Sequence, residues 1–329
     1  MKIASPPSIQ SPDLSSATDA LPHNSKVAIL ICTYNGARFL REQLDSFVRQ
    51  THQNWSIYAS DDGSSDETLQ ILNEYQFKLG NGRLSIFQGP KQGFAKNFFS
   101  LVRNPAISAD YFAFSDQDDI WFENKLERSI TQLATLSKNT PSLYCSRTLL
   151  VNSKKKKIGH SPLFKKPTSF QNALVQSIAG ANTMLINNAS RKLILRLADN
   201  TPVVAHDWLA YLLVSGCGGK VIYDPVPTLS YRQHEGNLIG ANADLKNQIL
   251  RIRKMLSGRF SEWSTLNLIA LNSIKDYLTD ENQQRLRNFE QARKSSFIPR
   301  LRLMGKSGAY RQTLKGNISL LIATVLNKI

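Results

Sequence analysis

Residues 27–40 read VAILICTYNGARFL, an apolar run followed by a polar loop and the start of a helical pattern. The run from Val27 to Ile31 is short, apolar throughout and rich in β-branched side chains, which is typical of a buried strand in a parallel sheet. The polar stretch that follows predicts a loop, and further apolar residues then fall on one face at helical spacing: Phe39, Leu40, Leu44, Phe47 and Val48. This stretch therefore predicts a strand, a loop and a helix, in that order.

The same alternation continues along the first half of the chain. Residues 55–60, 84–88 and 111–114 have the composition of further strands, and helical patterns follow residue 64 and residue 95. Ser64 and Glu67 have the spacing of a capping box, with Ser64 as the N-cap residue. Repeated strand and helix segments predict an α/β fold, in which helices cover both faces of an open, mostly parallel sheet.

Polar side chains follow three of the predicted strands directly: Thr33 and Asn35, Asp61 and Asp62, and Asp116 and Asp118. In open α/β sheets the carboxyl ends of the parallel strands line the ligand crevice. We therefore expect these six side chains to converge on one site, although they are distant in the sequence.

Asp116, Asp118 and Asp119 lie within four residues. Carboxylates held this close repel one another unless a cation compensates them, and Mg²⁺ or Mn²⁺ suits oxygen ligands beside substrate phosphates. The alternative is that these residues stabilise the first turn of the next helix. A carboxylate of the Asp61-Asp62 pair can accept the ring N–H of uracil or thymine, although Asp61 also has the position of a helix N-terminal charge.

The second half is less regular. Residues 143–151 and 184–186 have the composition of strands, His206 opens a helical pattern, and residues 221–223 and 228–231 read as late strands. From residue 246 onward the pattern is helical and basic, with 16 Lys and Arg against 5 Asp and Glu. Such an excess suits an acidic partner, either nucleic acid or an anionic membrane leaflet, or else a solvated helical face.

The remaining composition bounds the location of the protein. The three cysteines, Cys32, Cys145 and Cys217, are widely spaced, which disfavours a disulfide framework or a zinc site and fits a reducing compartment. Residues 1–25 are rich in Ser, Pro and Ala and predict a disordered tail. The apolar run at residues 318–326 is shorter than the roughly 20 residues of a spanning helix. We therefore expect a cytoplasmic protein that does not cross a membrane.

Four segments together resemble one known family. Residues 27–55, 57–68 and 111–126 (VAILICTYNGARFLREQLDSFVRQTHQNW, IYASDDGSSDET and YFAFSDQDDIWFENKL) are similar to the nucleotide-binding half of inverting family-2 glycosyltransferases, which have the Rossmann-like GT-A fold. Residues 206–242, which begin HDWLAYLL and contain SYRQHEGN, resemble the acceptor half of the rhamnosyltransferase-like branch. The resemblance covers roughly residues 26–243, and four ordered motifs specify a family far better than one.

The resemblance implies a domain organisation: a disordered tail at 1–25, a nucleotide-sugar-binding half at 26–120, an acceptor-binding and catalytic half of the same domain at 121–243, and a basic helical extension at 244–329. It also implies roles for residues that match the family motifs. The expected donor-binding residues are Thr33, Asn35, Asp62, Asp116 and Arg232, the metal ligands are Asp118 and His234, and the catalytic base is Asp207. Within that set, Thr33 and Asp62 contact the base, and Asp116 the ribose. From residue type alone, Asp207 also fits a helix N-terminal charge, and Arg232 a surface ion pair.

These roles describe an inverting, metal-dependent glycosyltransferase that uses Mg²⁺ or Mn²⁺. The expected reaction transfers rhamnose or another hexose from a dTDP- or UDP-linked donor to a glycan or lipid-linked glycan, in cell-surface polysaccharide biosynthesis. The chain lacks the QxxRW motif and the long spans of processive relatives, so one sugar or a few should be added. The basic C-terminal region would hold the enzyme on the inner face of the cell membrane. A nucleic-acid-binding protein and an inactive glycosyltransferase-like scaffold are the alternatives. The first lacks zinc spacing or an RNP motif, and complete acidic motifs argue against the second.

Overall fold

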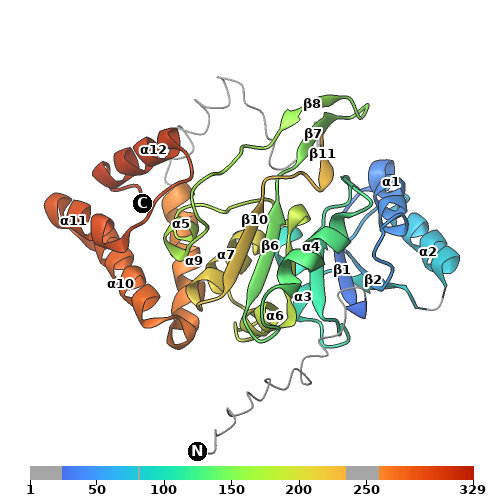
Figure 1. The fold of residues 1–329 in the computed structure, drawn as a ribbon, viewed down its shortest axis with the longest axis horizontal. Coiled ribbons are helices and arrows are strands. Elements are labelled where there is room, and N and C mark those ends of the chain that lie inside the picture. Colours follow the sequence, from blue (N-terminus) through green and yellow to red (C-terminus); the bar gives the residue numbers. More distant parts are fainter. Residues whose placement is uncertain (1–23, 81, 235–258) are drawn as a thin grey trace, which may run out of the picture.

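The computed structural model describes residues 24–80, 82–234 and 259–329. The predicted N-terminal tail therefore lies almost wholly outside the described residues, as do residues 235–243 of the acceptor half and the beginning of the basic C-terminal region. The described chain forms one large sheet between two helical layers, a small second sheet, and a helical C-terminal lobe (Figure 1).

The large sheet has seven strands in the order β10-β6-β9-β4-β1-β2-β3. Six strands run parallel, and β9 alone is antiparallel, between β4 and β6. The wholly buried β1 lies inside the sheet, as its unbroken apolar sequence predicts. The strands are β1 (Val27–Thr33), β2 (Trp55–Asp61), β3 (Leu84–Gln88), β4 (Tyr111–Ser115), β6 (Ser142–Ser146), β9 (Leu185–Asn187) and β10 (Lys220–Asp224).

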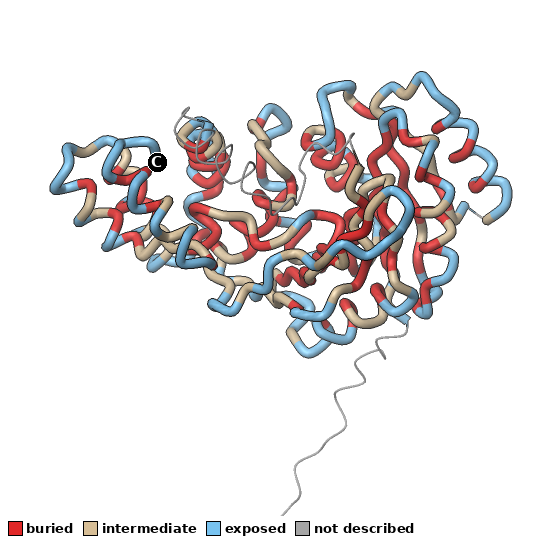
Figure 2. The backbone as a smooth tube through the Cα atoms, turned by 90° about the horizontal axis from the view of Figure 1, so that it is seen from above, coloured by how far each residue is buried: buried red, intermediate tan, exposed pale blue. Residues whose placement is uncertain are grey.

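Helices cover both faces of this sheet, which confirms the predicted α/β architecture. One apolar core joins α1, α2 and α4 to the odd-numbered side chains of β1, and the other joins α3 and α5–α7 to its even-numbered side chains. The inner strands β1, β2, β4, β6 and β9 are therefore buried along nearly their whole length (Figure 2). These helices are α1 (Ala37–Val48), α2 (Thr68–Leu79), α3 (Phe94–Arg103), α4 (Lys125–Ala134), α5 (Phe170–Ala173), α6 (Asn188–Leu195) and α7 (His206–Gly216).

The prediction of one strand over residues 143–151 was wrong, because the segment divides between two sheets. Residues up to Ser146 belong to β6, and those from Leu149 belong to β7 (Leu149–Asn152) of a four-stranded sheet ordered β5-β11-β7-β8. The polar residues between them turn the chain: Arg147 donates its backbone N–H to Asp224, and Ser146 bonds the Thr228 hydroxyl. The other members are β5 (Ile120–Trp121), β8 (Lys157–His160) and β11 (Leu229–Gln233).

The capping box predicted at Ser64 was also wrong. Helix α2 begins at Thr68, and Ser64 lies in the preceding loop, where its hydroxyl donates to Asp61 Oδ1 at 2.6 Å. Asp66 occupies the helix start instead, accepting from the backbone N–H and the hydroxyl of Thr68. A nearby carboxylate on the strand end thus attracts the serine more strongly than the helix terminus does.

The C-terminal region is helical from Arg259, as predicted. It comprises α9 (Arg259–Ser273), a short 3₁₀ turn (Lys275–Tyr277), α10 (Asp280–Lys294), α11 (Phe297–Ser307) and α12 (Leu314–Val325). Side-chain contacts join this lobe to the main domain, including Trp263 against Trp208 and Arg311 Nε donating to the Val175 carbonyl. Among the described residues, no helix is both long enough and apolar enough to span a bilayer.

Candidate active site

Side-chain hydrogen bonds join the loops at the carboxyl edge of the sheet. Gln117, in the loop after β4, accepts the Tyr34 N–H at 2.9 Å and donates to the Tyr34 carbonyl at 3.0 Å. These two bonds clamp the acidic loop to the loop after β1. They require Gly36, because a Cβ there would lie 2.2 Å from Gln117 Oε1. Neighbouring loops on different strands therefore hold one another in place.

Replacing Gly36 with alanine should break this clamp. The added methyl group displaces Gln117, and losing two hydrogen bonds should cost about 1–3 kcal/mol of unfolding free energy. A shift of the acidic loop by about 1 Å can reduce a reaction rate by about 10²-fold. We therefore expect Gly36→Ala to lower both the unfolding temperature and the rate of any reaction that depends on the acidic loop.

The matched control is Gly305→Ala in α11, where a Cβ meets no atom within 4 Å. Alanine is the better helix former, so this variant should keep full activity and gain up to about 1 kcal/mol. An unfolding temperature of Gly36→Ala equal to that of wild type, measured by thermal unfolding, would contradict the proposed clamp.

Of the paired carboxylates after β2, Asp61 is committed to its own loop. It is buried and accepts hydrogen bonds from Thr33 Oγ1 at 2.8 Å, from Ser64 N and Oγ, and from Gly63 N. Thr33 is only 1% exposed, so its hydroxyl is turned into this network. Asp62 is partly exposed and accepts the backbone N–H groups of Lys91 and Gly93. Thr33 and Asp62 are the two residues expected to contact the base, and of these Asp62 is therefore the one whose side chain is accessible.

Asn35 links two loops through both its backbone and its side chain. Its backbone has φ of 47°, in the left-handed region that asparagine tolerates better than most residues. Its N–H donates to Ser64 Oγ, and its Oδ1 accepts from Ser65 N at 2.8 Å. The structure thus places Asn35 at the carboxyl edge of the sheet, where it holds the loop after β1 against the loop after β2.

The acidic cluster after β4 carries more negative charge than its own surroundings neutralise. Burial, with the nearby charges of Asp118 and Asp207, raises the pKa of Asp116 to about 7. Burial and the neighbouring carboxylates also raise the pKa of Asp119 well above its usual value. Asp119 accepts from Asn182 Nδ2 at 2.6 Å and lies near the buried Lys125, whose pKa burial lowers to about 7. Asp119 therefore makes its contacts within the protein interior, whereas Asp116 and Asp118 are partly exposed.

Asp118 pairs with His234, and these are the two residues expected to bind a metal. Its Oδ2 lies 2.8 Å from His234 Nε2, and both side chains are 18% exposed. The imidazole ring also packs against Phe39, with ring centroids 4.8 Å apart. Residues 116 positions apart in the sequence thus meet at the end of β11.

Arg232 lies behind this pair and is 1% exposed. Its Nε donates to the Asp118 carbonyl at 3.0 Å, its Nη1 to the Ser153 carbonyl, and its Nη2 to Glu42 at 2.7 Å. The guanidinium also lies 4.4 Å from the centre of the Phe39 ring. The alternative of a surface ion pair holds only in part: Arg232 pairs with Glu42, whose side chain is 39% exposed, but the arginine itself is buried. This geometry suits an arginine that positions the Asp118 backbone better than one that reaches a substrate.

Asp207 lies in the first turn of α7 and approaches the acidic cluster closely enough to raise the pKa of Asp116. Its Oδ1 accepts the Trp208 N–H at 2.7 Å, and Ser177 Oγ lies 3.5 Å from Oδ2. Burial raises the pKa of Asp207 to about 6. The side chain remains partly exposed, so it combines a proton affinity suited to a general base with access to a bound molecule.

The adjacent His206 is an aromatic core residue. Its ring stacks on Phe98 at 4.0 Å and contacts Phe114 and Phe94 edge-on. Among the residues that the structure describes, neither ring nitrogen has a hydrogen-bond partner, and burial lowers the pKa of His206 to about 3. His206 is therefore neutral and packs as an aromatic ring.

The donor set fits a divalent cation that also binds substrate oxygens. Within the described ranges, no three His, Cys, Asp or Glu side chains are grouped to hold a metal by themselves. Asp118 and His234 supply an oxygen and a nitrogen, both accessible, beside further carboxylates. Mg²⁺ is commonly held by one or two carboxylates together with substrate phosphates and water. The residues present match that arrangement.

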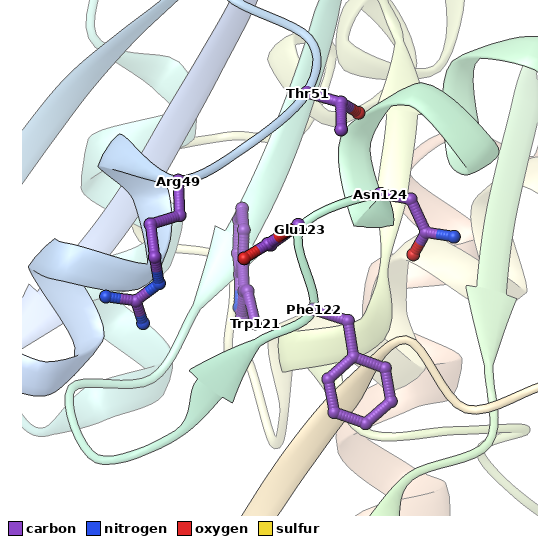
Figure 3. Close-up of a pocket in the computed structure, with 6 residues that line it drawn as sticks. All are labelled: Arg49, Thr51, Trp121, Phe122, Glu123 and Asn124. Atoms are coloured by element: carbon purple, nitrogen blue, oxygen red, sulfur yellow. The ribbon is translucent and has the colours of Figure 1, made fainter.

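A cavity of about 520 Å³ lies between the end of α1 and the start of α4, away from these acidic residues (Figure 3). Its lining includes Arg49, Trp121 and Glu123 and none of the predicted site residues. The loop contacts around it, such as Thr51 N donating to the Glu123 carbonyl, are those of ordinary packing. We therefore place the site at the carboxyl edge of the sheet, where the polar side chains converge.

Comparison with known proteins identifies the family of the chain. Residues 28–194 match the family described as Glycosyl transferase family 2. The dTDP-rhamnosyl transferase RfbG of Shigella flexneri is 30% identical over 233 residues, which cover 68% of this chain and 78% of RfbG.

Two solved structures have the same fold. TarS 1–349 of S. aureus in complex with UDP-GlcNAc has a TM-score of 0.51 at 15% identity, over 86% of this chain and 89% of that chain. GalNAc-T7 with UDP, GalNAc and Mn²⁺ has a TM-score of 0.51 at 12% identity, over 87% and 56%. At these identities the likeness concerns the fold, which is GT-A.

Proposed function

Because this chain belongs to glycosyl transferase family 2 and has the GT-A fold, we propose that it transfers hexose, one residue or a few per acceptor and with inversion, from a nucleotide sugar to a glycan. The observation that carries the proposal is the contact of Asp118 with His234 at 2.8 Å, and the charge of Asp207 also contributes to the raised pKa of Asp116. We propose that a general base, a ribose-side carboxylate and a metal site surround one place at the sheet edge. The similarity to RfbG favours dTDP-rhamnose, with UDP-hexoses as the other donors to be tested.

The proposed roles of the residues at the carboxyl edge of the sheet follow from how accessible their side chains are. We propose that Asp62 accepts the ring N–H of the base and that Asp116 binds the ribose hydroxyls. Thr33 and Asn35 hold the loops that shape this donor site, since their side-chain hydrogen bonds are made within the protein. Arg232 lies behind Asp118 and holds its backbone carbonyl in place through a hydrogen bond from Nε. We propose these positioning roles for Thr33, Asn35 and Arg232 in place of the donor contacts that the family resemblance implies.

Asp118 and His234 would hold Mg²⁺ or Mn²⁺ beneath the donor diphosphate. A bound divalent cation there supplies positive charge that stabilises the departing nucleoside diphosphate. The pKa of about 6 keeps Asp207 mostly ionised at neutral pH, so a carboxylate oxygen can accept the proton of the acceptor hydroxyl. The oxygen of that hydroxyl forms its bond to the anomeric carbon of the donor sugar from the face opposite the diphosphate. The bond to the diphosphate oxygen breaks at the same time, and its electron pair leaves with that oxygen.

The acceptor that we propose is a lipid-linked glycan in cell-surface polysaccharide biosynthesis, modified at the cytoplasmic face of the membrane. The net positive charge of the C-terminal quarter supports this location, because the inner leaflet is anionic. The absence of the QxxRW sequence supports the addition of one sugar or a few per acceptor.

Ligand-dependent thermal stability tests the donor and metal together. A ligand at 100 times its Kd adds about 2.7 kcal/mol of stability, which corresponds to several degrees in the unfolding temperature. We expect dTDP or UDP with Mn²⁺ to produce this shift, and nucleotide alone or Mn²⁺ alone to produce much less. ADP with Mn²⁺ is the control, because adenine lacks the ring N–H that Asp62 would accept. Equal shifts for all nucleotides would contradict the assignment of Asp62, and no shift would contradict nucleotide-sugar use.

A further inference from the structure

Helix α12 carries its largest apolar side chains on the outside of the protein. Leu314, Ile318, Leu321, Ile322 and Val325 recur at the spacing of one helical face, and they are between 41% and 78% exposed. The opposite face packs inward through Leu320, Ala323 and Thr324. A stripe of five exposed aliphatic side chains on one helix exceeds the scattered exposure that is normal on a protein surface.

The stripe is held in this orientation by Arg300 of α11, which is 8% exposed. Its Nη1 donates to the Thr324 and Val325 carbonyls at 3.2 and 3.3 Å, at the C-terminal end of α12. A cation at this end of a helix also interacts favourably with the helix dipole. The apolar face is therefore fixed outward by a buried contact on the other side of the helix.

The charge around the stripe has one sign. Residues 297–329 contain six Lys and Arg and no Asp or Glu. Four of these cations are exposed, namely Arg302, Lys306, Lys315 and Lys328. At the start of α11, Phe297 and Ile298 add further apolar surface and are 52% and 74% exposed. Exposed apolar and basic side chains thus occur on both α11 and α12, and we define residues 297–328 as the α11–α12 surface.

Two occupants could cover such a surface, and the charge decides between them. A second copy in a two-fold dimer would place the same patch against itself, so cations would face cations without a carboxylate from either patch. An anionic bilayer supplies both a hydrophobic layer and compensating phosphates. The length of α12 is also suitable: twelve residues extend about 18 Å, too short to cross a bilayer but sufficient to lie along its interface.

We propose that the α11–α12 surface docks on an anionic lipid bilayer, with the apolar stripe of α12 at the boundary between head groups and acyl chains. Arg302, Lys306, Lys315 and Lys328 then lie near lipid phosphates. This is a binding surface separate from the sugar-transfer site. It can be tested without donor or acceptor, so it stands or fails independently of the proposed reaction.

The test is co-sedimentation of the full chain with vesicles of phosphatidylcholine alone or with 30% phosphatidylglycerol. The apolar variant is Ile318→Ser/Leu321→Ser/Val325→Ser, and its matched control is Phe77→Ser. Phe77 is 92% exposed on α2, at the opposite end of the molecule from α12 (Figure 1). The charge variant is Lys315→Gln/Lys328→Gln, with Lys138→Gln/Lys275→Gln as its control, since both of those lysines are exposed elsewhere. Thermal unfolding verifies that each variant is folded.

We expect wild type to bind the phosphatidylglycerol vesicles and to bind phosphatidylcholine at least tenfold more weakly. The triple serine variant should lose about tenfold or more in partitioning, because burial of even one such side chain changes an equilibrium by about this factor. The charge variant should lose binding most clearly at low salt. The two controls should bind as wild type does. Vesicle binding equal to wild type in both α12 variants would overturn the proposal, as would a wild-type dimer that the triple serine variant dissociates.

Discussion

Asp207→Asn should reduce the rate of sugar transfer by about 10²–10⁴-fold, the range that a positioned general base contributes. Asparagine has nearly the same shape as aspartate and can keep the hydrogen bond from the Trp208 N–H, so the start of α7 should remain intact. What it loses is the ability to accept a proton. Donor binding, measured as stabilisation by nucleotide and Mn²⁺, should be retained. Comparable losses of binding and rate would indicate that the residue only maintains the fold.

The pH dependence separates proton transfer from a structural role. Burial raises the pKa of Asp207 to about 6, and the ionised form is the base. The kcat/KM of wild type should therefore be level above pH 7 and should fall about tenfold per unit below pH 6. The residual activity of Asp207→Asn should lack this inflection. Asp276→Asn, at an exposed carboxylate of the C-terminal lobe, should show the wild-type rate and profile. A profile without an inflection near pH 6 in wild type would contradict the assignment.

Asp118→Ala should lower the transfer rate by about 10²–10³-fold, as expected when one group that stabilises transition-state charge is removed. It should also abolish the additional stabilisation that Mn²⁺ gives with nucleotide. The ligand-free protein should remain nearly as stable as wild type. The hydrogen bond to His234 is lost, but Asp118 also raises the pKa of both Asp116 and Asp119, so its removal relieves repulsion between neighbouring carboxylates.

The matched control is Asp199→Ala, whose side chain is 93% exposed in a surface ion pair with Arg103. Exposed ion pairs contribute about 0–1 kcal/mol, so this variant should be active and nearly as stable as wild type. Full activity of Asp118→Ala in the presence of a chelator would refute metal-dependent catalysis at this residue. A large loss of stability would instead make Asp118 chiefly a structural residue.

Much of the fold could be predicted from the sequence because its signals are local. A fully buried parallel strand has an unbroken apolar sequence, as β1 does, and a polar loop marks the point where each strand ends. The position of Asp62, Asp116 and Asp118 at one sheet edge follows from parallel topology alone. The sequence also contains the SYRQHEGN segment, so the family resemblance implied that His234 and Asp118 lie close together as metal ligands.

The remaining contacts depend on positions in space that no local pattern encodes. Arg232 and Glu42 are 190 residues apart, and only the folded chain shows that the arginine is buried behind Asp118. The sequence shows that Gln117 lies between two aspartates. Its clamp on Tyr34, however, depends on the absence of a side chain at Gly36. Ser64 had two possible partners, and local spacing could not show that the carboxylate of Asp61 would be the stronger one.

The antiparallel strand β9 has a consequence for the order in which the chain is made. It pairs with both β4 and β6, so β4 gains its outer neighbour only when residues 185–187 are available. During synthesis at about 5–20 residues per second, the 72 residues between the ends of β4 and β9 take about 4 to 15 seconds to add. Throughout that time the completed β1–β4 segment has an unpaired strand edge, which is the kind of surface that recruits other chains. A ribosome-bound fragment ending near residue 120 should therefore depend on chaperones, whereas one ending beyond β10 should not.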